Sequence, residues 1–142
     1  MAHKIKLEIV SPEKVVHTED INMLIVRSTN GELGILPNHA PLIAGLVPNA
    51  MRVLNDNGES LIAVSGGFME VQPTKITILA AAAELPIHID VNRAQQAYER
   101  AQKRLDMFKT QPEQAKDLDM ERAQAALNRA KARLKATNTS LN

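Results

Sequence analysis

The 142-residue chain contains no cysteine and no tryptophan. Without cysteine it cannot form disulfide scaffolds, thiolate metal sites or cysteine nucleophiles. Aromatic residues make up 2% of the sequence, and they are Phe68, Tyr98 and Phe108. Carbohydrates and single-stranded nucleic acids are usually bound by stacking on aromatic rings, so this scarcity argues against both ligand classes.

Long hydrophobic runs are missing as well. The apolar stretch at residues 76–83 is far shorter than the roughly 20 residues that a membrane-spanning helix needs. The first residues lack the apolar core of a secretory signal, which predicts a cytosolic-facing location. A chain of this length, with 44% hydrophobic and 23% charged residues, has the composition of a globular domain with a small appendage.

The composition changes near residue 90. All six glycines and six of the seven prolines precede this point, whereas ten alanines fall between residues 91 and 136. Glycine and proline typically separate short strands, and alanine favours helices. The sequence therefore predicts a strand-rich unit at residues 1–86 and a helical unit at residues 87–142.

The first unit has the pattern of an all-β domain. Residues 4–9 alternate strictly and place Ile5, Leu7 and Ile9 on one face, as a half-buried strand requires. Residues 55–58, with the sequence Asn-Asp-Asn-Gly, are typical of a tight hairpin, and a Pro-Thr pair at residues 73–74 indicates another reversal. Further strands are predicted at residues 23–27, 34–36, 50–54, 61–65, 68–72 and 75–79. Together these features indicate a sandwich of about ten short strands.

The second unit has the pattern of two helices. Apolar residues recur every three or four positions from 91 to 108 and again from 120 to 134, and the proline at position 112 interrupts the pattern. We expect an antiparallel hairpin, which makes the overall fold class α+β. Alanine occupies stripe positions 94, 101, 123 and 130, so the helices bury little apolar area and are expected to be only marginally stable alone.

Charge is distributed unevenly between the two units. Residues 1–90 carry a net charge of −4 and residues 91–142 a net charge of +5, and no acidic residue follows Glu121. A basic end of this kind is attracted to an acidic protein surface, a phosphate or a lipid headgroup. A solvated helix face is the simpler alternative.

Patterns of catalytic or metal-binding residues are not found. The four histidines are dispersed without metal-ligand spacing, and Ser65 lacks the glycine two positions earlier that a nucleophile elbow requires.

What remains is a set of arginines. Arg93 and Arg100 are two turns apart on the first helix, and Arg129 and Arg133 are one turn apart on the second. If the hairpin closes, the four guanidinium groups converge, and a triphosphate is a suitable counter-ion for them. Asp90 stands at the position of a helix N-cap.

Three segments carry a resemblance to a known family. The sequences GELGILPNHAPL at residues 31–42, SGGFMEV at 65–71 and TILA at 77–80 are similar to the epsilon subunits of bacterial F-type ATP synthases. The similarity extends over nearly the whole chain, and the order of a β-sandwich followed by an alanine-rich hairpin agrees with it.

The resemblance implies a non-catalytic subunit of the rotary central stalk. In the family the sandwich binds the gamma subunit and rests on the rotor ring, with the loop that contains His39 near that contact. The hairpin alternates between a compact form and an extended form that reaches the alpha and beta subunits and inhibits ATP hydrolysis. The implied location is the cytoplasmic side of the bacterial membrane, with membrane contact only through the complex and no nucleic-acid partner.

The resemblance also implies a nucleotide site. The IDVNRA sequence at residues 89–94 matches the motif of the members that bind ATP. ATP is then a regulatory ligand and no cofactor is required, while the question of an accompanying Mg²⁺ stays open. The implied nucleotide-binding residues are Glu84, Ile89, Asp90, Arg93, Ala94, Arg100, Arg129 and Arg133.

The chain departs from the family at two places. Asn38 replaces a glycine that is usual there, and asparagine tolerates the left-handed backbone that such a position needs. The connection at residues 111–119 is longer than usual, which affects how Arg129 and Arg133 meet the arginines of the first helix.

Two other functions are alternatives to this interpretation. A nucleic-acid accessory factor could use the basic final helix on phosphates, but the net charge of +1 and the scarcity of aromatic residues argue against it. An enzyme would need a nucleophile with its base or a metal cluster, and the sequence offers neither pattern.

Overall fold

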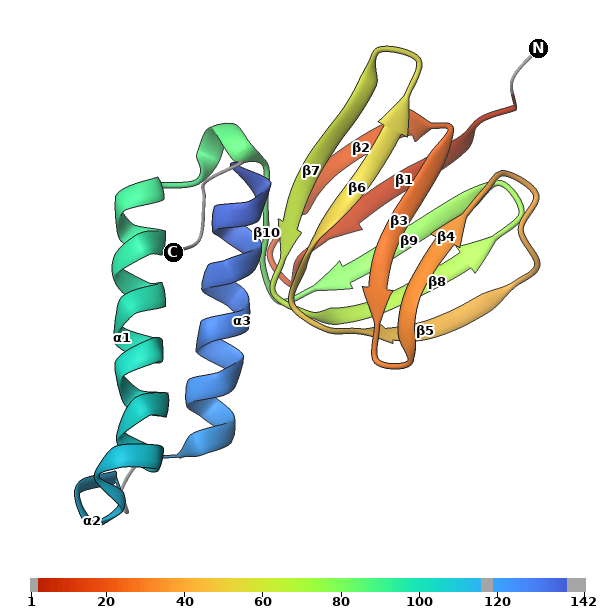
Figure 1. Ribbon diagram of the computed structural model, residues 1–142. Helices are drawn as coiled ribbons and strands as arrows, with labels where there is room; N and C mark the ends of the chain where they lie inside the picture. The colour runs from red at the N-terminus through yellow and green to blue at the C-terminus, as the bar shows by residue number, and fades with distance from the viewer. Residues whose placement is uncertain (1–2, 116–118, 138–142) are drawn as a thin grey trace.

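A computed structural model describes residues 3–115 and 119–137 of the chain. An all-β sandwich forms the N-terminal part, and two long antiparallel helices stand beside it (Figure 1), which confirms the predicted fold class. The strands are β1 (Ile5–Val10), β2 (Val15–Ile21), β3 (Met23–Ser28), β4 (Gly31–Ile35), β5 (Leu42–Leu46), β6 (Asn49–Asn55), β7 (Gly58–Val64), β8 (Gly67–Gln72), β9 (Lys75–Ala80) and β10 (Ala83–Glu84).

The ten strands form one hydrogen-bonded sheet that folds over into two layers (Figure 1). Their order is β10, β7, β6, β3, β5, β8, β9, β1 and β2, and β4 also pairs with β3, outside this order. Strands β1 and β9 run parallel, and the other pairings are antiparallel. Such antiparallel layers bury one face and leave the other exposed, which explains the alternating sequence pattern.

The alternation predicted for the first strand is confirmed. Ile5, Leu7 and Ile9 are completely buried, and they pack with inward-facing aliphatic residues of both layers. The predicted hairpin at residues 55–58 joins β6 to β7, with Asn55 opposite Gly58 and Gly58 at a φ of 121°. The reversal at residues 73–74 joins β8 to β9.

Strands β2, β5 and β10 were not predicted from the sequence. Strand β2 lies at the end of the sheet and pairs only with β1, so its His-Thr-Glu-Asp stretch shows no apolar alternation. Strand β5 is short, follows Pro41 closely and contains Gly45, which weakens its pattern. Strand β10 has two residues and is defined only by its pairing with β7.

The helical part consists of a 3-10 turn η1 (Pro86–His88) and the helices α1 (Val91–Thr110), α2 (Pro112–Ala115) and α3 (Met120–Ala136). The predicted break after Thr110 is confirmed. Pro112 begins the short helix α2, because proline is favoured in a first helical turn. Residues 116–118, part of the expected longer connection, lie outside the described residues. The four alanines predicted in the stripes are buried.

Helix α3 joins the hairpin to the sandwich. It lies against β6 and β7, whereas α1 packs on its other side (Figure 1). A small apolar cluster fills this junction, in which Ala63 of β7 meets Ile89, Ala132 and Leu134. The hairpin therefore rests on the sandwich. The boundary between two separate domains at residue 86 stays a prediction. Among the described residues, none of the helices has the length and hydropathy needed to cross a membrane.

Candidate nucleotide-binding site

A cavity of about 420 Å³ opens where β10, η1, α1 and the end of α3 meet. It is assembled from segments of the chain that the closed hairpin brings together, so it depends on the position of α3. The residues that line it are Glu84, His88, Asp90, Arg93, Ala94, Ala97, Arg100 and Arg133.

Asp90 fixes the start of α1 at the mouth of this cavity. Its Oδ1 accepts a hydrogen bond of 3.1 Å from the backbone N–H of Arg93, which confirms the predicted N-cap. The cap sets the helical register, and Arg93 and Arg100 then line the cavity two turns apart. Ala94 and Ala97 leave room between them because their side chains are small.

Glu84 and Arg133 form an ion pair within the cavity wall. The Nε of Arg133 lies 2.6 Å from Oε1 of Glu84, and both side chains are about two-thirds buried. The pair connects β10 to α3. Within the described part of the chain, Arg93 and Arg100 have no ion-pair partner, so the cavity presents two guanidinium groups that are not held by a carboxylate.

The remaining predicted residues lie nearby but not in the same wall. Ile89 is buried in the apolar junction, where it packs beside Ala94. Arg129 lines a neighbouring small cavity that shares Glu84 and Arg133 with the first one. The structure thus brings Arg93, Arg100 and Arg133 into one cavity and places Arg129 beside it.

Two lining residues were missed by sequence reasoning. His88 ends the 3-10 turn immediately before Ile89, and Ala97 lies one turn after Arg93. The spacing of Ala97 could have revealed it, since residues three and four apart share a helix face. Nothing in the sequence predicted the 3-10 turn that places His88.

The described residues contain no group of three or more acidic or histidine side chains that could hold a metal ion. The cavity contains arginine guanidinium groups and two carboxylates. Asp90 caps α1, and Glu84 is paired with Arg133. Arginines of this kind bind phosphate oxygens through paired hydrogen bonds.

His39 lies far from this cavity. It belongs to the connection between β4 and β5, on the side of the sandwich away from the hairpin (Figure 1). Its Nδ1 is 2.6 Å from the carbonyl oxygen of Ala40. Asn38 adopts the left-handed conformation that was expected at this position, with a φ of 66°, and its N–H donates to the carbonyl of Pro73 at 2.9 Å.

The outer face of β5, β8 and β9 carries three exposed apolar side chains. Ile43, Phe68 and Leu79 expose 75%, 62% and 51% of their surface. Phe68 and Leu79 are direct cross-strand partners, and Ile43 lies on the neighbouring strand β5. Clustered exposure of this kind is typical of protein contact surfaces.

Comparisons with known proteins agree with this architecture. Residues 4–86 match the family described as ATP synthase, Delta/Epsilon chain, beta-sandwich domain, and residues 88–138 match its long alpha-helix domain. The ATP synthase epsilon chain of Alkalihalophilus pseudofirmus is 51% identical over 105 residues, which cover 74% of this chain and 79% of the relative. That of Halalkalibacterium halodurans is 50% identical over 103 residues, covering 72% and 77%. The chain therefore belongs to the delta/epsilon family of ATP synthase chains, as a non-catalytic subunit of the epsilon type.

Solved structures share the fold. A chain in the cryo-EM structure of the Euglena gracilis mitochondrial ATP synthase, comprising OSCP, F1 and the c-ring, superimposes with a TM-score of 0.75. The alignment covers 95% of this chain and 81% of that one at 22% identity. At this identity the comparison shows that the sandwich and helices are arranged alike. It does not assign a role to any single residue.

Proposed function

We propose that this chain is a regulatory subunit of the ATP synthase central stalk and that its closed hairpin binds ATP. The observation that carries the proposal is the cavity in which Arg93, Arg100 and Arg133 come together. The triphosphate would lie among these arginines, and the carboxylates of Glu84 and Asp90 would lie toward the nucleoside. ATP acts here as a regulatory ligand.

ATP would favour the closed hairpin because the ATP site combines residues of α1, α3 and β10, which lie together only in the closed form. A ligand that binds only one state stabilises that state by RT ln(1 + [L]/Kd), or about 3 kcal/mol at a hundredfold excess over Kd. At low ATP the helices would separate from the sandwich and extend toward the alpha and beta subunits, which would inhibit ATP hydrolysis. The buried alanines between the helices support this, since a small side chain contributes less apolar area to a contact than a large one and such a contact costs less to open.

The sandwich would connect the hairpin to the rotor. The exposed apolar face formed by Ile43, Phe68 and Leu79 suits a contact with the gamma subunit. The loop that contains His39 would face the rotor ring. In this arrangement the chain is peripheral, on the cytoplasmic side of a bacterial membrane, and reaches the membrane only through the complex.

Calorimetric titration of ATP into the isolated full chain tests the nucleotide site. We expect saturable binding with one ATP per chain, in the presence and absence of Mg²⁺ so that its contribution is measured. The absence of heat at millimolar ATP, under conditions where the chain is folded by circular dichroism, would reject the site.

Inhibition is tested in the assembled complex. ATP hydrolysis is compared between complexes that carry the full chain and complexes that carry residues 1–86 only. We expect faster hydrolysis without the hairpin, with the difference largest at low ATP. Equal rates at every ATP concentration would reject the regulatory part of the proposal.

A further inference from the structure

A second cavity lies on the other side of α3, between this helix and the sandwich. Its volume is about 480 Å³, which is within the range of small-molecule sites. Residues of β3, β4 and β6 form one wall, and one face of α3 forms the other. We refer to it as the seam groove.

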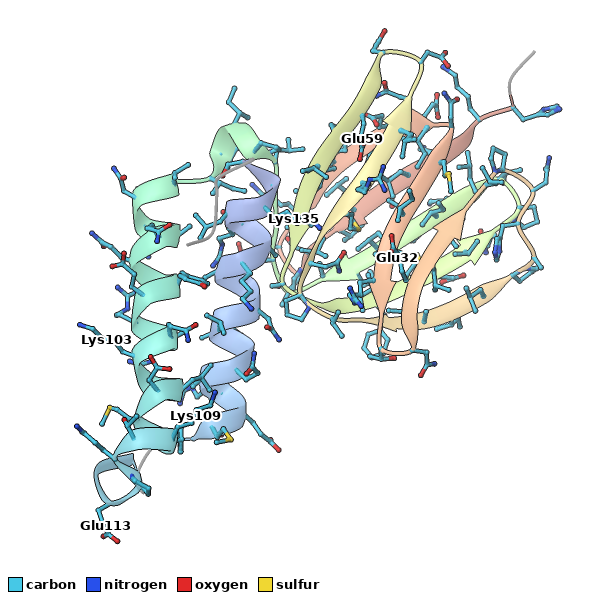
Figure 2. The ribbon with its side chains drawn as sticks, viewed as in Figure 1. Glu32, Glu59, Lys103, Lys109, Glu113 and Lys135 are labelled. Atoms are coloured by element: carbon cyan, nitrogen blue, oxygen red, sulfur yellow. The ribbon has the colours of Figure 1, made fainter. Side chains whose placement is uncertain are left out.

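The α3 wall of the seam groove follows from helical spacing. Asn128, Lys131, Ala132 and Lys135 all line it, and apart from the adjacent Lys131 and Ala132 their positions differ by three or four residues or by two turns. Figure 2 shows Lys135 between α3 and the sandwich. The two lysines therefore extend over the sheet side of the helix.

The sheet wall adds two arginines, Arg27 of β3 and Arg52 of β6. Arg52 is held by Glu59 on the adjacent strand β7, through its Nε and through its Nη2 at 3.3 Å. Arg27 has no ion pair within the described residues, and neither do Lys131 and Lys135. One carboxylate, Glu32, also lines the groove. Three cations without an ion-pair partner among the described residues thus border a single cavity, and Glu32 lies opposite Arg27 across the β3–β4 pairing.

The floor of the seam groove is apolar and fixed. The Asn49 side chain accepts a hydrogen bond from the N–H of Arg27 at 3.3 Å and donates to the carbonyl of Val47 at 2.6 Å. These bonds hold the connection between β5 and β6 against β3. The apolar floor residues are Ile25, Val47, Pro48, Ala50 and Ala132.

We infer that the seam groove is a second anion site, which binds a small phosphate ester with its phosphate at Arg27, Lys131 and Lys135 and its organic part on the apolar floor. Cationic side chains that lack partners suit a phosphate, and a floor without charge suits an organic group. The site is distinct from the cavity at Arg93, because the two share no lining residue.

Binding in the seam groove couples to the position of the hairpin. The phosphate contacts come from β3 and from α3, so the complete site exists only while α3 rests on the sheet. A ligand there stabilises the docked helix by mass action, whatever occupies the cavity at Arg93. The groove thus provides a second chemical control of hairpin opening.

The experiment titrates phenyl phosphate and inorganic phosphate into the full chain and follows backbone amide shifts by NMR. We expect saturable binding of phenyl phosphate, with a Kd of about 1 mM or below, and shifts in β3, β6 and α3. Inorganic phosphate should bind severalfold more weakly because it leaves the apolar floor empty. Equal affinities would reject the phosphate-ester assignment, and no saturable binding would reject the site.

Variants locate the binding. Arg27→Ala and Lys131→Ala should each weaken phenyl phosphate binding at least about fivefold, as the loss of one charge-assisted contact predicts. Lys131→Arg should restore it. Lys103→Ala removes a matched exposed lysine from the far side of α1 (Figure 2) and should change nothing.

Arg93→Ala distinguishes the two cavities. It should weaken ATP binding and leave phenyl phosphate binding unchanged. Phenyl phosphate binding that is lost in Arg93→Ala but kept in Arg27→Ala and Lys131→Ala would overturn the inference, while leaving the proposed ATP site in place. Amide exchange in α3 should slow when phenyl phosphate is added, and unchanged exchange at saturation would overturn the coupling.

Discussion

Glu84 and Arg133 are 49 residues apart in sequence, and their side chains meet at 2.6 Å between β10 and the last turn of α3. This ion pair is a polar connection between the sandwich and the hairpin in addition to the apolar junction. It also orients Arg133 into the cavity that Arg93 and Arg100 line. A polyanion that binds Arg133 therefore either displaces Glu84 or binds guanidinium N–H groups that Glu84 leaves free.

Glu84→Gln should loosen the docking of α3. It removes the negative charge but keeps the size of the side chain, and a half-buried hydrogen bond to a charged group contributes about 1–2 kcal/mol. We expect faster hydrogen exchange in α3, measured by mass spectrometry, with unchanged exchange in the β1 and β9 core. Glu121→Gln is the control, since it changes an exposed acid in the first turn of the same helix. Equal protection of α3 in both variants would show that the ion pair does not hold the helix.

Arg100→Ala should weaken ATP binding. The loss of one charge-assisted hydrogen bond, about 1.5–3 kcal/mol, corresponds to a roughly tenfold to hundredfold higher Kd in calorimetry. Lys103→Ala removes a positive charge from the same helix outside the cavity, and its Kd should stay within about twofold of the parent value. A similar loss in both variants would indicate a general charge effect and no specific site.

The fold was largely predictable because its signals are local. The alternation of Ile5, Leu7 and Ile9, the hairpin at residues 55–58 and the alanine stripes each depend on neighbouring residues. Strands β2, β5 and β10 lack such signals. Strands β5 and β10 are defined by pairing with β8 and β7, which are distant from them in sequence, and β2 lies at the end of the sheet, where it pairs with β1.

The site was only partly predictable. Helical spacing placed Arg93 and Arg100 on one face, and the cap at Asp90 followed from residue type. The separation of Arg129 from the other arginines depends on how α3 is rotated against β7, which spacing alone does not determine. The same rotation directs Lys131 and Lys135 to the seam groove, and no sequence pattern indicates that Arg27 lies across the groove from them.

Asp90→Ala should destabilise the start of α1. The Asp90 carboxylate caps the helix through Arg93 N–H, and the loss of such a cap costs about 1 kcal/mol. The expected result is faster amide exchange in the first turn of α1 and weaker ATP binding, because the cap sets the position of Arg93. Asp119→Ala removes the equivalent cap of α3, whose N–H donor belongs to Arg122, and should affect the other end of the hairpin. ATP binding reduced equally by both variants would contradict a local role for Asp90.

Acid should weaken the sandwich through two exposed ion pairs. A hydrogen bond from Lys4 lowers the pKa of Asp56, and a hydrogen bond from Arg52 lowers the pKa of Glu59, from ordinary values of 3.8 and 4.5. The unfolded chain therefore binds more protons than the folded chain near pH 4, so stability falls as pH decreases through this range. Above about pH 5.5 these groups should contribute no pH dependence.

Urea unfolding at a series of pH values measures this effect. The double variant Asp56→Asn and Glu59→Gln should lose less stability than the parent between pH 5 and pH 3, because neither position can then take up a proton. Parallel curves for parent and variant would show that other carboxylates cause the acid sensitivity. Asp106→Asn on α1 is the control for a general change in charge.

Gly67→Ala should be strongly destabilising, because both space and backbone conformation oppose a side chain. An added Cβ would lie 2.0 Å from the carbonyl oxygen of Leu79, and the φ of Gly67 is 141°. Relief of this clash requires separation of β8 from β9 in the middle of the sheet, so we expect a loss of about 4 kcal/mol or more in urea unfolding. Gly58→Ala is the matched control, since its φ is 121° and no atom lies within 4 Å of the added Cβ. Backbone strain alone should cost about 1–3 kcal/mol there. Losses of equal size would mean that conformation, and not the close approach of the two strands, requires glycine at position 67.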